Sequence, residues 1–212
     1  MYLFTRSTRI APGHTRAAMT WATEITERAT ESTDLHMSLH AQVFSPETGT
    51  VTWSTFVDDL NQLEAAEDKL MVDDQFQSLV DRGVEYTPHG VQDGLLQLVH
   101  GEPDTSRTID YVVVNRSVCA PGAMAKGLEL GVAIAQKATE LSGHTTMFGM
   151  DTTGAFGGVG WMTGYANLAD LQAAEAKVFS DADFIALVDD GAVDVYTDDI
   201  TANTQRIYRR LI

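Results

Sequence analysis

Cysteine and positive charge are both scarce in this chain. Cys119 is the single cysteine among 212 residues, so no disulfide can form within the chain. This fits a reducing compartment, and we expect a cytoplasmic protein. Only 14 Lys and Arg stand against 30 Asp and Glu, a formal net charge of −16. Because nucleic acids and anionic membrane surfaces are bound through basic patches, this balance argues against both as partners.

Long apolar runs and short catalytic motifs are also missing. The opening MYLFTRSTRI has no signal-peptide core, and the uncharged stretch 152–169 is too rich in Gly, Thr and Asn to cross a membrane. The chain has no P-loop, nucleophile elbow, CxxC pair or metal-ligand spacing. We therefore predict no metal site, and either a site free of cofactors or a protein without catalytic activity.

The chain contains an internal repeat. APGH at 11–14 recurs as APGA at 120–123, and ATE at 29–31 recurs at 138–140, both with an offset of 109. From Trp53 to Gly83, 14 of 31 positions are identical to those 108 residues later. Self-similarity over this length indicates a duplicated half.

Each half has the same predicted order of elements. A strand (2–9; 110–118) leads through Pro-Gly to a helix (14–31; 123–142), and two strands follow (35–44 and 50–57; 145–151 and 158–165). Asp59, Asn167, Asp73 and Asp181 occupy N-cap positions of two further helices per half. A last strand closes each half (94–100; 204–211), and Gly83 and Gly191 are expected as left-handed C-terminal residues.

This βαββαβ order is the ferredoxin-like pattern of the α+β class. A four-stranded sheet with helices on one face leaves its other face uncovered. We therefore predict two tandem ferredoxin-like repeats, 1–101 and 109–212, joined by a linker at 102–108. Their antiparallel sheets would face each other and form an intrachain α/β barrel, which allows a monomer and leaves a homodimer open.

On these elements, the chain resembles the dimeric α/β-barrel superfamily. The resemblance rests on strand–APG–helix, the Trp strand and the helix pair ending in D-x-x-F-x-x-L-V, and it covers nearly the whole chain. It is greatest to antibiotic-biosynthesis-type monooxygenases and NIPSNAP-type proteins. The superfamily holds oxygenases, haem-degrading enzymes, isomerases, cyclases and proteins without known chemistry, so the fold alone does not give the function.

The resemblance implies candidate residues in the second half. Haem-degrading members carry an Asn on the first strand, a Trp on the third and a His after the second helix. Asn115 and Trp161 match the first two, but neither 76–83 nor 184–191 contains a His. We therefore expect no haem and no other cofactor. Asn115 would hold a substrate oxygen, Trp161 would form the pocket wall, and Tyr165 and Asp151 would contact the ligand.

A second group of candidates lies in the first half. In HMSLHAQ, His36, Ser38, His40 and Gln42 share one face if the segment is a strand. His40 is the candidate general base, with Gln42 beside it. Arg6 and Trp53 occupy the positions of Asn115 and Trp161 and are further candidates for ligand contact. A solvated polar face and two structural Trp residues are the alternative interpretation, and His14, His89, His100 and His144 are expected at the surface.

The glycine-rich strand 158–165 completes the prediction. Gly160 and Gly164 replace Thr52 and Phe56 of the first half, so they either free cavity volume, admit another backbone, or mark a bend or bulge. The first functional hypothesis is a barrel that binds a hydrophobic or aromatic metabolite, as a cofactor-independent monooxygenase or a cyclase/isomerase. The second is a non-catalytic ligand carrier, stress protein or assembly protein.

Overall fold

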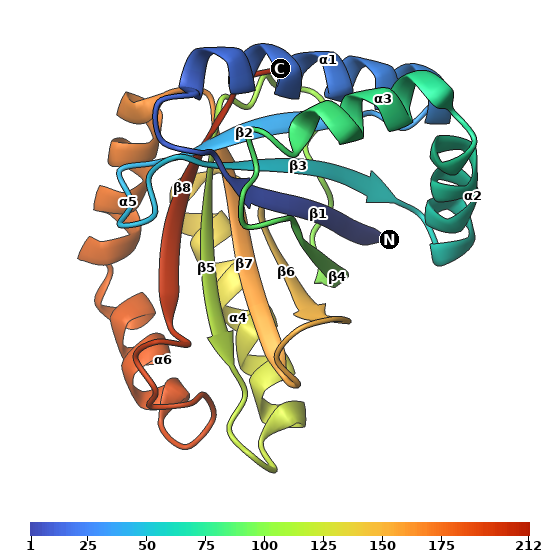
Figure 1. The fold of residues 1–212 in the computed structure, drawn as a ribbon. Helices are drawn as coiled ribbons and strands as arrows, with labels where there is room; N and C mark the ends of the chain where they lie inside the picture. Colours follow the sequence, from blue (N-terminus) through green and yellow to red (C-terminus); the bar gives the residue numbers. More distant parts are fainter. The chain divides into compact units, whose positions relative to one another are not determined.

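The computed structural model describes residues 1–212 and contains eight strands and six helices (Figure 1). In chain order they are β1 (Tyr2–Arg9), α1 (Thr15–Thr33), β2 (Ser38–Val43), β3 (Thr50–Val57), α2 (Leu60–Met71), α3 (Asp74–Gly83), β4 (Gln92–His100), β5 (Tyr111–Val118), α4 (Met124–Ser142), β6 (Thr146–Asp151), β7 (Gly158–Tyr165), α5 (Leu168–Ser180), α6 (Ala182–Ala192) and β8 (Thr204–Arg210). The hydrogen-bonded strand order β1-β3-β2-β8-β5-β7-β6-β4 is that of a closed barrel. The predicted α+β barrel class is confirmed.

The chain forms two compact units. Unit 1 comprises Met1–Leu95 with Arg209–Ile212, and unit 2 comprises Leu96–Tyr208. They differ from the repeats 1–101 and 109–212 because strand pairing crosses the repeats. Leu96–His100 of β4 pairs with β6, while the amide of Leu211 donates to the carbonyl of Leu39 in β2. The units are defined by contacts between residues, whereas the repeats are defined by similarity in sequence. The units therefore do not test the repeat boundaries, which stay a prediction.

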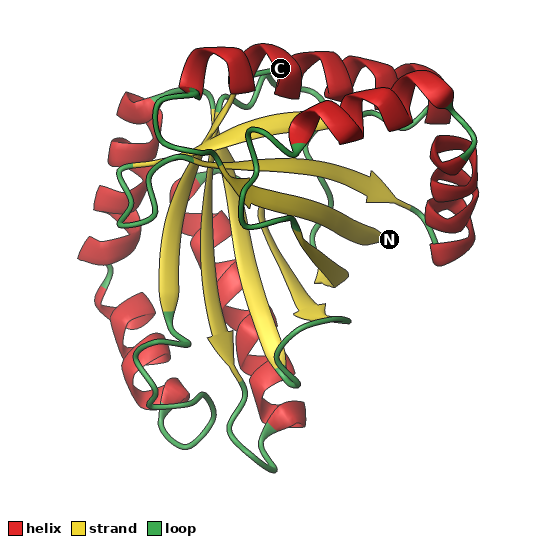
Figure 2. Ribbon diagram, in the orientation of Figure 1, coloured by secondary structure: helices red, strands yellow, loops and turns green.

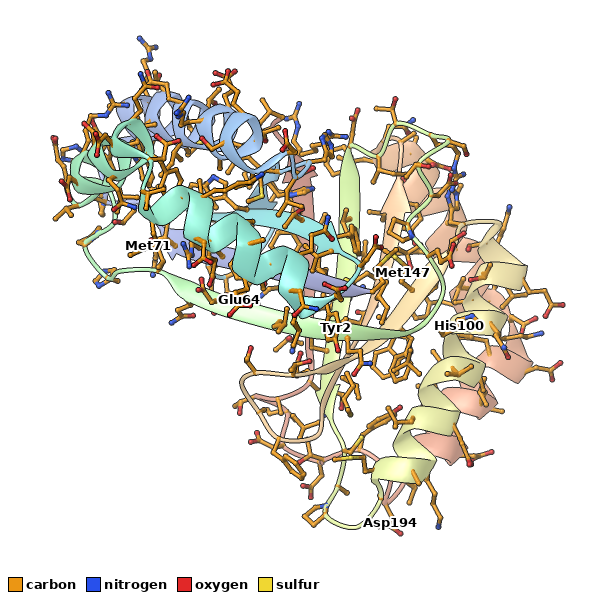
Figure 3. All side chains as sticks on the ribbon, turned by 90° about the vertical axis from the view of Figure 1, so that its right-hand side faces the viewer. Tyr2, Glu64, Met71, His100, Met147 and Asp194 are labelled. Carbon is orange, nitrogen blue, oxygen red and sulfur yellow. The ribbon has the colours of Figure 1, made fainter.

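Unit 1 is a sheet with helices packed on one face (Figure 2). β1 pairs with β3, and β3 with β2, both antiparallel. Leu39 and Trp53 of the sheet share a core cluster with Ala18, Trp21 and Ala22 of α1. Successive strand residues point to opposite faces, so His40 and Thr52 face away from α1. Tyr2 and Glu64, labelled in Figure 3, mark where α2 lies beside the start of β1.

Unit 2 repeats this arrangement with different side chains. β5 pairs with β7, and β7 with β6, both antiparallel. Phe148 and Trp161 cluster with Ala135 of α4, and Val113 and Tyr165 cluster with α5. His100 and Met147, labelled in Figure 3, lie along the β4–β6 edge of this sheet.

The predicted N-caps are confirmed. The side chains of Asp59 and Asn167 accept hydrogen bonds from the amides of Gln62 and Asp170, each at 2.9 Å. Asp73 and Asp181 cap α3 and α6 through the amides of Phe76 and Phe184. These bonds satisfy amides that have no partner within the helix.

The prediction for Gly83 and Gly191 is wrong, because neither residue has a positive φ. A Cβ on Gly83 would instead overlap the indole of Trp21, and one on Gly191 would lie 2.8 Å from Cδ1 of Leu130. These glycines therefore allow the last turns of α3 and α6 to approach the first helix of each half.

The glycines of β7 lie against neighbouring side chains. Pairing between β5 and β7 runs without interruption, which rules out a bulge. A Cβ on Gly160 would lie 3.4 Å from Leu96, and one on Gly164 would lie 2.8 Å from Ile109. Ile109 therefore occupies the space beside Gly164, whereas a Cβ at Gly160 would make only ordinary van der Waals contacts, so its neighbours do not require glycine at that position.

His36 does not belong to the strand predicted for it. β2 begins at Ser38, after Asp34 adopts a left-handed conformation, so His36 lies before the strand and is exposed. His36 therefore does not share the strand face of His40.

No helix of the structure combines the length and apolar character that a membrane crossing requires.

Candidate functional site

His40 lies among hydroxyl groups on the sheet face away from α1. It is paired in register with Thr52, whose Oγ1 is 2.8 Å from Oγ of Ser7. Burial and the positive charge of Arg210 lower the pKa of His40, a hydrogen bond with the backbone of Thr52 opposes the shift, and the net result is a pKa of about 4. The imidazole is therefore neutral at pH 7. Gln42 is buried and donates to Ser45.

Arg6 and Trp53 lie opposite each other on β1 and β3. Nε and Nη2 of Arg6 donate to the two carboxylate oxygens of Asp93 at 2.7 and 2.6 Å. Trp53 is buried, and its Nε1 donates to Oγ1 of Thr26 at 2.8 Å. Both side chains thus donate hydrogen bonds to partners within unit 1.

Asn115 and Trp161 are also partners in register, in unit 2. Asn115 is exposed, whereas Trp161 is 8% exposed and donates from Nε1 to the carbonyl of Gly131 at 2.9 Å. Phe148 and Tyr196 cover its ring, with centroids at 5.1 and 5.6 Å. The indole is enclosed by these neighbours.

Asp151 and Tyr165 lie apart from that pair. Asp151 forms an ion pair with Arg116. Tyr165 is buried with its ring 4.9 Å from that of His144, and burial raises its pKa to about 12. His144 itself is 7% exposed and its Nε2 is 3.0 Å from Asp170. The expectation of a surface position for His144 is therefore wrong, because it occupies the core position of Leu35 in the first half.

A groove in unit 1 is lined by residues that the sequence did not indicate as site residues, including His14, which was expected only at the surface. It lies between the start of α1 and the end of α3, has a volume of about 530 Å³, and its lining includes His14, Arg16, Trp21, Glu24, Arg82 and Tyr86. A second groove of about 450 Å³ shares Glu24 with it and continues along the same two helices. The first groove is large enough for a small organic molecule.

Aromatic side chains form the floor of this groove. The rings of Trp21 and Tyr86 have centroids 5.8 Å apart, and Trp21 stands edge-on to Trp53 at 5.7 Å. Nε1 of Trp21 donates to the carbonyl of Leu79 at 2.7 Å, which fixes the indole against α3. Because Gly83 has no side chain, the end of α3 rests directly on this ring.

The loop that carries His14 is tied to the loop after α3. The amide of Ala11 donates to the carbonyl of Tyr86 at 2.9 Å. Gly13 has φ +87°, which favours glycine at the turn into α1. His14 lies with its ring centroid 6.0 Å from that of Tyr86, and its Nδ1 is 3.6 Å from Glu85. The groove therefore holds an imidazole beside a carboxylate, next to two aromatic rings.

Comparing the two halves residue by residue would have revealed this groove. The second half carries Ala123, Ala125, Leu130, Ala133 and Asp190 where the first carries the groove residues His14, Arg16, Trp21, Glu24 and Arg82. The groove chemistry is thus confined to the first half. No group of three or more His, Cys, Asp or Glu in the structure is placed to hold a metal ion.

Comparisons with known proteins establish the fold. No protein-family model matches the chain, and no curated protein matches its sequence. A candidate monooxygenase of Fusobacterium nucleatum matches 100% of this chain and 92% of its own, with a TM-score of 0.74 and 9% identity. An anthrone oxidase-like protein matches 100% of this chain and 91% of its own, with a TM-score of 0.68 and 13% identity.

A match of half length completes the comparison. A NIPSNAP domain protein of Burkholderia xenovorans covers 49% of this chain and 100% of its own, with a TM-score of 0.44 and 20% identity. The two full-length matches confirm the predicted α/β-barrel fold. Their identities are too low to transfer a reaction, which must be argued from the residues of this chain.

Proposed function

We propose that this protein binds a hydrophobic aromatic small molecule in the groove between α1 and α3 and transforms it without a resident cofactor. The reaction class is that of a monooxygenase or of a cyclase/isomerase. The observation that carries the proposal is a groove of about 530 Å³ in which Trp21 and Tyr86 lie beside His14. The names of the two full-length fold relatives support the oxygenase class.

Both reaction classes begin with the removal of an acidic proton from the substrate. His14 is the base in this proposal, and Glu85 beside Nδ1 stabilises the imidazolium that forms on proton uptake. In the oxygenation, dioxygen is the oxidant: the substrate loses two hydrogens and gains one oxygen atom, and the second oxygen atom leaves as water. In the isomerisation, the same proton returns to another carbon.

His40 is the competing candidate for the base. Its pKa of about 4 makes it a weak proton acceptor at neutral pH, although its neutral ring can accept a hydrogen bond. It also lies on the sheet face away from α1, whereas His14 lines the groove. The proposal therefore assigns proton removal to His14, and the substitutions His14→Ala and His40→Ala distinguish the two.

The non-catalytic alternative is favoured by one observation. Leu63, Ala66, Phe76 and Leu79 of the packing helices are identical in the second half, whereas the polar groove residues are not. A ligand carrier needs the packing and the groove but no base. Under this alternative a bound ligand is recovered unchanged.

The test is native mass spectrometry of the protein purified from its own host, together with its visible absorption spectrum. The proposal expects a bound aromatic mass that is absent from Trp21→Leu, and dioxygen consumption or isomerisation of the extracted ligand that His14→Ala abolishes. If His40→Ala abolished this activity and His14→Ala did not, the base would be His40 on β2. An unchanged ligand would establish the carrier, a Soret band would establish haem, and a clean apo mass would contradict ligand binding.

A further inference from the structure

The charges around the groove point to a class of ligand. This inference rests on the proposed function, because it concerns what the same groove selects. We propose that the groove takes a planar aromatic carboxylate, with its ring against Trp21 and Tyr86 and its carboxylate at Arg16. The elements of this arrangement are an aromatic floor, a cation that makes no ion pair, and an acidic protein around them.

Aromatic rings line the groove, with Tyr86 half-buried and Trp21 5% exposed. Trp21 and Tyr86 are inclined at 46° with centroids 5.8 Å apart, and His14 adds a third ring 6.0 Å from Tyr86. Aromatic pairs favour such offset or tilted contacts at 4.5–7 Å. An aliphatic ligand of equal size would fill the volume but gain none of these ring contacts.

The two arginines of the groove differ in whether they form an ion pair. Arg82 forms an ion pair with Glu24, which also lines the groove, so these two charges offset each other. Arg16 is exposed on the first turn of α1 and makes no ion pair in the structure. Glu85, the other carboxylate near the groove, lies beside His14, so Arg16 is the cation of the groove that no carboxylate pairs.

That single charge matters because the chain as a whole carries −16. The surrounding negative potential disfavours anions at most of the surface, so an anionic ligand needs a local cation. A guanidinium binds a carboxylate through two parallel hydrogen bonds, which gives it more selectivity than an ammonium. The start of α1, where His14 forms no capping hydrogen bond, adds partial positive charge at the same end of the groove.

The test uses isothermal titration calorimetry of the full chain with two probes of the same shape, naphthalene-2-carboxylate and naphthalene-2-carboxamide. We expect the carboxylate to bind about tenfold more tightly, as a charge-assisted hydrogen bond pair predicts. Arg16→Ala, which installs the residue found at the matching position of the second half, should remove this preference and leave carboxamide binding unchanged.

A matched control separates local recognition from net charge. Lys126→Ala removes one exposed positive charge from the first turn of α4 and should leave the preference intact. Equal affinity for both probes, with binding of both lost in Trp21→Leu, would overturn the carboxylate inference and keep the ligand groove. Absence of binding by either probe, or binding that Trp21→Leu does not affect, would overturn the groove itself.

Discussion

The two halves of the chain surround the same tryptophan in different ways. In unit 1, Trp53 meets the indole of Trp21, which in turn meets Tyr86. In unit 2, Trp161 meets Tyr196 directly, and the hydroxyl of Tyr196 donates to the carbonyl of Gly127 at 2.6 Å. One extra ring therefore separates the sheet tryptophan from the loop tyrosine in unit 1.

The residues of the first helix explain this difference. Leu130 stands in α4 where Trp21 stands in α1, and Gly127 and Gly131 replace Ala18 and Ala22. The smaller side chains of α4 let Tyr196 reach the helix backbone and bury its own hydroxyl, and burial raises the pKa of that hydroxyl. The same fold therefore buries its sheet tryptophan in two ways, directly against Tyr196 in unit 2 and behind the indole of Trp21, which lines the groove, in unit 1.

The largest effect should follow from Trp21→Leu, which gives unit 1 the residue of unit 2. The change removes a buried ring and its hydrogen bond to Leu79, so we expect the free energy of unfolding to fall by about 3 kcal/mol. Urea denaturation measures this, and binding of naphthalene-2-carboxylate should be lost. Retained binding in the folded variant would contradict the role of Trp21 in the groove.

The next effect should follow from Gly131→Ala. A Cβ at Gly131 would overlap the ring of Phe148, so the free energy of unfolding should fall by about 2 kcal/mol through overpacking. The first half carries Ala22 and Leu39 at these positions, which suggests the compensating change. The double variant Gly131→Ala with Phe148→Leu should recover part of the loss in urea denaturation, and a purely additive result would contradict this coupling.

A smaller effect should follow from Gly83→Ala. Overlap with the rigid indole of Trp21 destabilises, while the better helix propensity of Ala offsets part of the cost, so a net loss of about 1 kcal/mol is expected. Gly191→Ala is the matched control, because its neighbour Leu130 is a flexible side chain that can move. Thermal unfolding of the two variants should therefore differ, and equal Tm values would refute the distinction.

The smallest effect concerns acid stability. Hydrogen bonds from Ser32 and the amide of Phe76 lower the pKa of Asp73 to about 2, helped by Arg28. Because the folded pKa lies below the unfolded value of about 3.9, this contribution is complete above that value and is lost as pH falls towards 2. Asp73→Asn should flatten the dependence of unfolding free energy on pH in this window more than Asp181→Asn does.

Local sequence signals predicted much of the fold. The apolar periodicity, the N-cap residues and the repeat gave the element order and the barrel class, because each depends on neighbours in sequence. The prediction for Gly83 is wrong because the side chain that requires a glycine there is the indole of Trp21, which lies 62 positions earlier in the chain. The prediction for His144 is wrong for the same kind of reason: His144 lies between α4 and β6, and its partner Asp170 comes from α5.

The candidate site was harder to predict for a related reason. The groove forms where the turn before α1 meets the loop after α3, and the APG motif of that turn recurs in the second half, so it does not mark the groove. His14 gave no signal as an isolated residue. The substitution of His14, Trp21 and Arg82 by Ala123, Leu130 and Asp190 in the second half was visible in the sequence and marks the groove.

The most direct test is an NMR titration that follows the three tryptophan indole N–H signals, of Trp21, Trp53 and Trp161. Naphthalene-2-carboxylate added to the ¹⁵N-labelled protein should shift the Trp21 signal most and the Trp53 signal less, and leave the Trp161 signal in place. A shift of Trp161 without a shift of Trp21 would place the ligand in the second half and contradict the account.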